Sequence, residues 1–140
     1  MKKVENDAFK IALNLISRRP YFSFELSKKL IDKGFNQNEV NDTINRLIKS
    51  LLISDEERFK ELINYYQNVR KFGINRIKYE LFKRGAEREL IDDMIEKYYS
   101  FEAHNKIQNE LIEKKKGELI NEEQYKAKQK IYTYLKRRGF

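Results

Sequence analysis

Large apolar side chains recur along the chain at the spacing of three and four residues that an α-helix requires. The clearest stripes are Phe9, Ala12, Leu13 and Ile16; Val40, Ile44, Leu47, Ile48 and Leu51; Phe59, Leu62, Ile63, Tyr66 and Val69; and Ile91, Met94, Ile95 and Tyr98. Because a helix completes a turn every 3.6 residues, each stripe lies on one side of its helix and must pack against a neighbour. The pattern predicts an all-α fold of about eight helices.

A short motif of Leu, three residues and Gly occurs three times, with a further apolar residue four positions before each Leu. The copies are Leu26, Leu30 and Gly34; Ile77, Leu81 and Gly85; and Ile131, Leu135 and Gly139. The glycines are separated by 51 and 54 residues, a period typical of tandem three-helix repeats. Each glycine is expected to end the second helix of its repeat in a left-handed conformation, which glycine adopts without steric cost.

This period predicts two complete three-helix repeats and a partial third one. The predicted boundaries are 1–54, 55–100 and 101–140. The third repeat reaches Phe140 at the point where its last helix should begin, so we expect it to be incomplete at the C-terminus. Tyr132, Leu135 and Phe140 are then expected to lack their usual cover, and the C-terminal segment to fray or to self-associate.

Helix starts are indicated by side chains that can accept the free N–H groups of a first turn. Ser23 precedes Phe-Glu-Leu, Asn36 stands three residues before Glu39, and Asp55 opens the sequence Asp-Glu-Glu-Arg-Phe. Each of these side chains is predicted to cap the helix that follows it.

Composition limits the chemistry available to the chain. Its 140 residues include no Cys and one His, which excludes disulfides, thiolate metal sites, cysteine nucleophiles and histidine clusters. We expect His104 to be an ordinary helix-surface or packing residue, and Asp92, Asp93 and Glu96 to form a solvated acidic face. No enzymatic activity, metal or cofactor is therefore expected. Because the chain lacks a membrane span and a signal peptide, a cytoplasmic protein is predicted.

Positive charge is concentrated in the turn and second helix of every repeat. The net charge of the chain is +8, and segments 18–33, 70–84 and 126–138 carry +3, +5 and +6. The candidate contact residues are Arg18, Arg19, Lys29, Lys33, Arg70, Lys71, Arg76, Lys78, Lys83, Arg84, Lys136, Arg137 and Arg138. Stacked repeats would align them into a stripe that attracts a polyanion or an acidic protein surface. The same cations would equally solvate outer helix faces or complement helix C-termini.

Four segments carry motifs that can be compared with a known family. They are residues 12–26, with Arg18 or Arg19, Ser23, Glu25 and Leu26 at characteristic positions; residues 52–59; residues 70–85; and residues 134–140. In this order and at this spacing they resemble the RecX family, the modulators of RecA recombinase. The resemblance implies an elongated crescent of three-helix repeats that lodges in the groove of the RecA–DNA filament and inhibits recombinase and ATPase activity.

The implied partners are the RecA filament and single- or double-stranded DNA, which a monomer would bind weakly and without sequence preference. Tyr79 and Tyr134 lie within basic helices and are candidates for contact with bases or with a partner. We also expect Arg76, Lys78 and Arg84 to avoid the apolar stripe, so that reversing their charge leaves the helices intact.

A second function remains open. Residues 23–50 read as helix, turn and helix, so the chain would also suit a stand-alone DNA-binding protein of the helix-turn-helix type. Glu39 and Asp42 argue against this hypothesis, because they begin the helix that would approach the phosphates.

Overall fold

The computed structural model of the protein describes residues 2–140, with side chains from residue 8 onward. This part of the chain contains eight α-helices and no strand, which confirms the predicted all-α fold. The helices are α1 (Lys2–Arg18), α2 (Ser23–Asp32), α3 (Gln37–Lys49), α4 (Asp55–Asn68), α5 (Ile74–Lys83), α6 (Arg88–Tyr98), α7 (Phe101–Glu118) and α8 (Gln124–Arg137). Within the described range, none of them is both long and apolar enough to cross a membrane.

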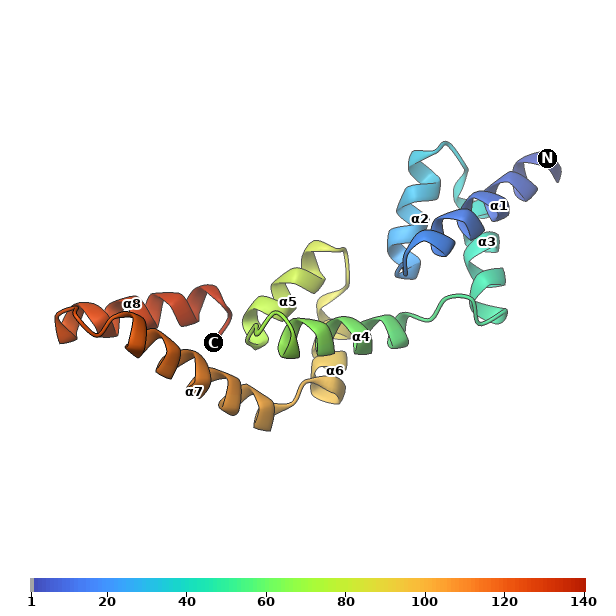
Figure 1. Ribbon diagram of the computed structural model, residues 1–140. Helices are drawn as coiled ribbons and strands as arrows, with labels where there is room; N and C mark the ends of the chain where they lie inside the picture. Colours follow the sequence, from blue (N-terminus) through green and yellow to red (C-terminus); the bar gives the residue numbers. More distant parts are fainter. Residues whose placement is uncertain (1) are drawn as a thin grey trace. The chain divides into compact units, whose positions relative to one another are not determined.

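The chain divides into two compact units, Met1–Phe59 and Lys60–Phe140. In the first unit, α3 packs against both α1 and α2 (Figure 1). Their shared core consists of Ala12, Tyr21, Leu26, Leu30, Val40, Ile44, Leu47 and Ile53. Ile48 and Leu51, which were predicted to belong to the apolar stripe of α3, are 46% and 88% exposed. Ile48 lies at the edge of the stripe, and Leu51 lies beyond the end of the helix.

An acidic residue from the start of α4 holds the start of α2. The Asp55 carboxylate accepts hydrogen bonds from the Ser23 hydroxyl and from the Ser23 backbone N–H, the latter at 2.7 Å. The prediction that Ser23 and Asp55 cap the helices that follow them is therefore wrong. The Ser23 hydroxyl donates a hydrogen bond instead of accepting one, and the Asp55 carboxylate accepts from the start of α2 instead of the start of α4. Ser54 takes the capping position for α4. Asn36 caps α3 as predicted, by accepting from the Glu39 N–H at 2.9 Å.

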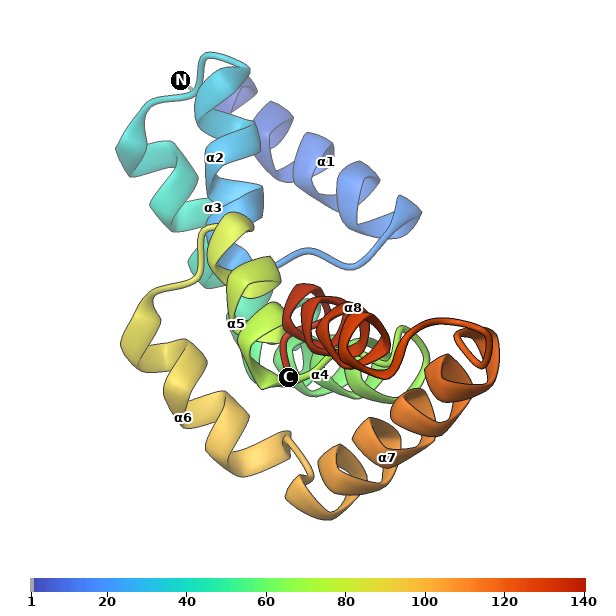
Figure 2. The same ribbon diagram turned by 90° about the vertical axis from the view of Figure 1, so that its left-hand side faces the viewer.

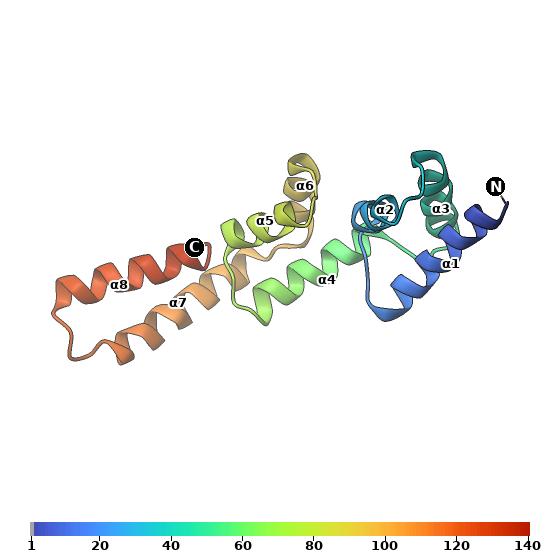
Figure 3. The same ribbon diagram turned by 90° about the horizontal axis from the view of Figure 1, so that it is seen from above.

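In the second unit, α5 packs against α6, and α7 and α8 form an antiparallel hairpin (Figure 3). Its buried apolar side chains include Leu62, Ile63, Tyr66, Ile77, Leu81, Ile91, Ile95 and Tyr99. The buried amide of Gln67 donates to the Ser100 carbonyl at 2.6 Å and accepts from the Ser100 N–H at 3.1 Å. These two hydrogen bonds fix the start of α7 against α4. Val69, predicted to extend the α4 stripe, is exposed because α4 ends one residue earlier.

The three repeated glycines have one backbone geometry. The φ angles of Gly34, Gly85 and Gly139 are 102°, 106° and 94°. Each glycine N–H donates to the carbonyl three residues before it, and the next N–H donates to the carbonyl five residues before it. These are the two bonds of a Schellman motif, in which a left-handed residue satisfies the last carbonyls of a helix. The predicted left-handed conformation of the three glycines is confirmed.

The end of α8 is tied to the start of α5 (Figure 2). The Gly73 N–H donates to the Arg138 carbonyl at 2.6 Å, and the Asn75 N–H donates to the Gly139 carbonyl at 3.1 Å. The first N–H groups of a helix need acceptors, and Gly73, which precedes α5, has no side chain to supply one. The two carbonyls therefore cap α5. We call this contact between residues 137–140 and residues 70–76 the C-terminal clasp.

The C-terminal clasp corrects one expectation about the end of the chain. Leu135 is buried, and the ring of Phe140 is half-buried with its centre 4.9 Å from that of His104. Tyr132 is 64% exposed. The prediction that all three side chains are uncovered is therefore wrong for Leu135, which is buried, and for Phe140, which packs against His104 of α7.

Candidate functional site

Four of the predicted contact residues lie on α2 or within five residues of its ends. Arg18, Lys29 and Lys33 are exposed, and no described residue forms an ion pair with them. The guanidinium of Arg19, in contrast, lies 3.6 Å from the centre of the Tyr21 ring and donates to the carbonyl of the next residue at 2.8 Å. The first three side chains thus remain available to a partner, whereas Arg19 is engaged within the first unit.

The cations of α5 are largely paired. Arg76 donates to Glu80 at 2.9 Å and to the Arg137 carbonyl at 3.1 Å, and the Lys83 ammonium lies 3.3 Å from the same carboxylate. Burial of Glu80 opposes its ionisation, but the hydrogen bonds from Arg76 and Lys83 outweigh burial and lower the pKa of the carboxyl below its ordinary value. Glu80 therefore neutralises part of the positive charge that the sequence places here.

Three arginines surround Phe72 inside the C-terminal clasp. The guanidinium groups of Arg70, Arg76 and Arg138 lie 4.8, 4.7 and 5.4 Å from the centre of this buried ring, within the range of cation–π attraction. Arg138 also donates to the carbonyl of Lys71 at 3.2 Å and to that of Arg70. These arginines stabilise the fold of the second unit before they contact any partner.

Two further cations connect segments of the second unit. Lys78 of α5 lies 3.2 Å from Asp92 of α6, and Arg84 donates to the Tyr66 hydroxyl at 3.3 Å. Together with the bonds of Arg76, these contacts mean that reversing the charge of Arg76, Lys78 and Arg84 would also break interactions within the second unit. That the helices stay intact in such a variant stays a prediction. A defect in such a variant would not distinguish loss of binding from loss of folding.

The predicted contact residues thus fall into two groups. Lys136 and Arg137 are exposed on α8, and no described residue forms an ion pair with either of them, although the Lys136 ammonium lies 5.4 Å from the centre of the exposed Tyr132 ring. We define the outward cations as Arg18, Lys29, Lys33, Lys136 and Arg137. The remaining predicted residues make internal contacts or belong to the loop of the C-terminal clasp: Arg19, Arg70, Lys71, Arg76, Lys78, Lys83, Arg84 and Arg138.

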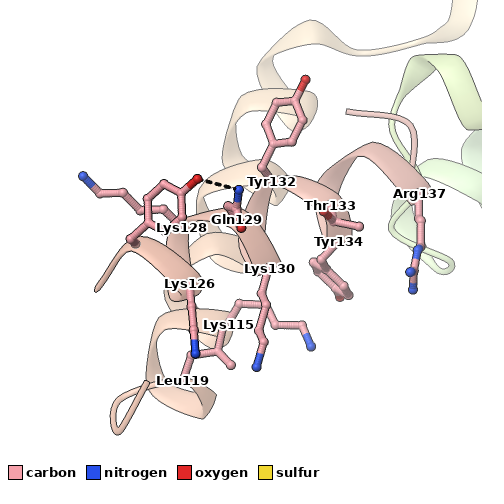
Figure 4. Close-up of a pocket in the computed structure, with 11 residues that line it drawn as sticks. Lys115, Leu119, Lys126, Lys128, Gln129, Lys130, Tyr132, Thr133, Tyr134 and Arg137 are labelled. Atoms are coloured by element: carbon pink, nitrogen blue, oxygen red, sulfur yellow. Dashed lines mark hydrogen bonds between the residues drawn. The ribbon is translucent and has the colours of Figure 1, made fainter. Parts of the chain in front are cut away.

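A groove of about 950 Å³ runs along α7 and α8 (Figure 4). We call it the α7–α8 groove, and its lining residues are Lys115, Leu119, Tyr125, Lys126, Lys128, Gln129, Lys130, Tyr132, Thr133, Tyr134 and Arg137. The lining combines five cations with three tyrosines and contains no carboxylate. The positive charge of α8 was predictable from the sequence, but the place of Lys115 beside it was not, because only the hairpin brings α7 next to α8.

The two tyrosines predicted to contact bases or a partner have different environments. Tyr79 is 53% exposed and lies with Phe82 and Arg88 at a second groove of about 380 Å³ between α5 and α6. Tyr134 is half-buried, and the Lys115 ammonium lies 4.4 Å from the centre of its ring. Tyr79 is therefore the more accessible of the two.

His104 packs inside the second unit. Its Nδ1 is hydrogen-bonded to the Tyr99 hydroxyl, and its ring lies between those of Tyr99 and Phe140. Burial lowers the pKa of His104 below its ordinary value and raises the pKa of Tyr99 to about 12, an effect that a hydrogen bond with the Ile74 backbone opposes. Among the described residues, no group of three His, Cys, Asp or Glu side chains is arranged to hold a metal ion.

Family descriptions and individual relatives both match this chain. The family model for the first three-helix domain of RecX matches residues 8–47, and the model for the third matches residues 109–140. The regulatory protein RecX of Haemophilus influenzae strain Rd is 36% identical, over 95% of this chain and 86% of its own length. The chain belongs to the RecX family. The regulatory protein RecX of Chlorobium limicola is 27% identical, over 97% of this chain and 83% of its own length.

Solved RecX structures have the same fold. The crystal structure of RecX from Lactobacillus salivarius superposes with a TM-score of 0.91 at 22% identity, and the match covers 100% of this chain and 90% of that one. A second crystal structure of a regulatory protein RecX gives a TM-score of 0.83 at 20% identity. The resemblance to RecX and the predicted class of three-helix domains are thus confirmed, whereas the boundaries 1–54, 55–100 and 101–140 stay predictions.

Proposed function

We propose that this protein binds the RecA–DNA filament and inhibits its recombinase and ATPase activities. Family membership carries the proposal, because relatives that match nearly the whole chain are named regulatory proteins RecX. We further propose that it acts in the cytoplasm as a monomer without enzymatic activity of its own.

The outward cations supply a physical means of binding. A filament that encloses DNA presents phosphates together with a protein surface that repeats at regular intervals, and Lys and Arg side chains neutralise phosphates by releasing counterions. Cations on α2 and on α8 belong to one chain, so a second contact forms intramolecularly after the first. Several weak contacts then bind well together.

The test is a titration of the protein into RecA that hydrolyses ATP on single-stranded DNA. The variant carries Lys29→Glu, Lys33→Glu and Lys136→Glu, three outward cations whose side chains have no ion-pair partner among the described residues. We expect half-maximal inhibition to require at least about ten-fold more of this variant, because its charge now repels phosphate.

A charge-matched control carries Lys10→Glu, Lys60→Glu and Lys106→Glu. These exposed positions lie on α1, α4 and α7, the first helix of each predicted repeat. We expect it to inhibit like the parent chain, with circular dichroism confirming that both variants are folded. Failure of the parent chain to slow ATP hydrolysis would overturn the proposal. Tight binding of one defined duplex at physiological salt, without inhibition, would instead support the stand-alone helix-turn-helix DNA reader.

A further inference from the structure

Two rows of side chains lie next to each other on α8 along the α7–α8 groove. The first row is Lys126, Lys130, Thr133 and Arg137, and the second is Tyr125, Gln129 and Tyr132. Both rows follow the spacing of four and three residues that keeps side chains on one helix face. The cationic row extends over roughly 16 Å of helix, because each residue adds about 1.5 Å.

Several cations of the groove have no acidic partner. Lys115 is paired with Glu118 at 3.0 Å, and Lys130 is paired with Glu122. No described residue forms an ion pair with Lys126, Lys128 or Arg137, all of which are exposed. These three groups give the groove an uncompensated positive charge that favours an anionic ligand.

The tyrosines beside these cations present their rings to solvent. Tyr125 and Tyr132 are 66% and 64% exposed, and the Gln129 amide between them donates to the Tyr125 hydroxyl at 3.0 Å, which fixes the orientation of that ring. In Figure 4, Tyr132 extends from α8 on the side away from Lys126 and Lys130. A ligand that uses both rows therefore needs charges on one side and flat, stackable groups on the other.

We propose that the α7–α8 groove binds single-stranded nucleic acid, with the phosphates on Lys126 and Arg137 of the cationic row and the bases stacked on Tyr125 and Tyr132. Lys128, three residues after Tyr125, adds positive charge on the side of the tyrosines. Positive grooves lined by aromatic side chains bind single strands in this way without sequence preference, because every base has a face that can stack. The inference rests on the proposed function, which it deepens by assigning the nucleic-acid contact to one groove.

The geometry favours a single strand over a duplex and over an acidic peptide. In a duplex the bases are already stacked and paired, so a duplex would satisfy the cations but would leave the exposed rings of Tyr125 and Tyr132 without stacking partners. An acidic peptide would satisfy the cations but would leave the exposed rings of Tyr125 and Tyr132 without planar partners. A single strand satisfies both rows.

The experiment measures fluorescence anisotropy of a labelled oligothymidylate with the full chain and no recombinase present. The variant carries Lys126→Gln, Lys128→Gln and Arg137→Gln, and the matched control carries Lys60→Gln, Lys106→Gln and Lys114→Gln, exposed positions on α4 and α7. We expect the variant to bind at least about ten-fold more weakly at low salt, and its plot of log affinity against log salt to be less steep by about 2. The control should bind like the parent chain; equal losses in the two variants would overturn the assignment.

Base stacking requires a second comparison. The parent chain should bind oligothymidylate at least about five-fold more tightly than an abasic strand with the same number of phosphates. Tyr125→Ala combined with Tyr132→Ala should abolish this preference, whereas Tyr65→Ala, at an exposed tyrosine of α4, should preserve it. Equal affinity for oligothymidylate, for a duplex and for polyglutamate of matched charge would overturn the proposal.

The outcomes separate this inference from the proposed function. If the parent chain binds oligothymidylate through the groove but does not slow ATP hydrolysis by RecA, the proposed function fails and the groove assignment stands. If it inhibits RecA while the groove variant binds oligothymidylate like the parent, the groove assignment fails and the proposed function stands.

Discussion

A Cβ atom added to Gly73 would lie 2.6 Å from both the carbonyl carbon and the carbonyl oxygen of Gly139. The two backbones therefore approach more closely than any residue with a side chain allows. This approach lets the N–H groups at the start of α5 reach the last carbonyls after α8. Glycine is required at both positions for this contact.

Gly139→Ala should destabilise the protein strongly. Its Cβ would lie 2.2 Å from the backbone nitrogen of Arg76, and alanine would also have to adopt a φ of 94°. We expect the free energy of unfolding to fall by about 2 kcal/mol or more, measured by urea denaturation. Gly34→Ala is the control, because its φ is 102° but no atom lies within 4 Å, so its loss should be about 1 kcal/mol. Equal losses at the two positions would contradict the close approach.

Gly117→Ala should stabilise the protein. Gly117 lies inside α7, has no left-handed φ, and leaves open space for a Cβ atom. Alanine restricts the unfolded chain more than glycine does, so we expect a gain of about 0.5–1 kcal/mol and a higher thermal unfolding midpoint. A lower midpoint would show that another segment needs this space.

Asp55→Ala should destabilise the first unit by about 1–2 kcal/mol, since it removes the two carboxylate acceptors of Ser23 at the start of α2. Hydrogen exchange of the Ser23 amide should accelerate at the same time. Asp42→Ala, at an exposed position of α3, should change stability by less than about 0.5 kcal/mol. A similar effect of the two substitutions would exclude a capping role for Asp55.

Stability should fall as the pH decreases through the range of histidine titration. Burial lowers the pKa of His104 below its ordinary value of 6.5, so the unfolded chain binds a proton more readily than the folded one. The contribution of the neutral imidazole is complete above pH 6.5 and is lost as the pH falls below this value toward the folded-state pKa. We expect unfolding midpoints measured at pH 7.5 and pH 5 to differ less in His104→Gln than in the parent chain. An NMR titration of the His104 imidazole with a midpoint above 6.5 would show that folding raises this pKa, and would contradict the prediction.

Local features of the fold were predictable from the sequence. The spacing of Gly34, Gly85 and Gly139 predicted three equivalent helix ends, because a Schellman motif depends on one residue and its immediate neighbours. The acceptor at the start of α2 was not predictable, since Asp55 lies 32 residues after Ser23 and resembles a cap for its own helix. Sequence patterns indicate that a helix start needs an acceptor, but not which distant segment provides it.

The candidate site was predictable only as a concentration of charge. A count of cations treats Arg137 and Arg138 alike, yet the first side chain lines the α7–α8 groove and the second donates to backbone carbonyls near Phe72. The difference depends on tertiary contacts between α8 and residues 70–76. For the same reason, the sequence could not assign Lys115 to the candidate site, because this residue lies beside α8 only in the folded hairpin.

The C-terminal clasp also has a consequence for the order in which the chain folds during synthesis. The first unit contains its own acceptor for α2 as soon as Asp55 has been added. The start of α5 must wait until residues 138 and 139 leave the ribosome, more than sixty residues after Gly73. At an elongation rate of about 5–20 residues per second, the N–H groups at the start of α5 lack these two acceptors for several seconds, whereas Ser23 at the start of α2 waits for only 32 residues.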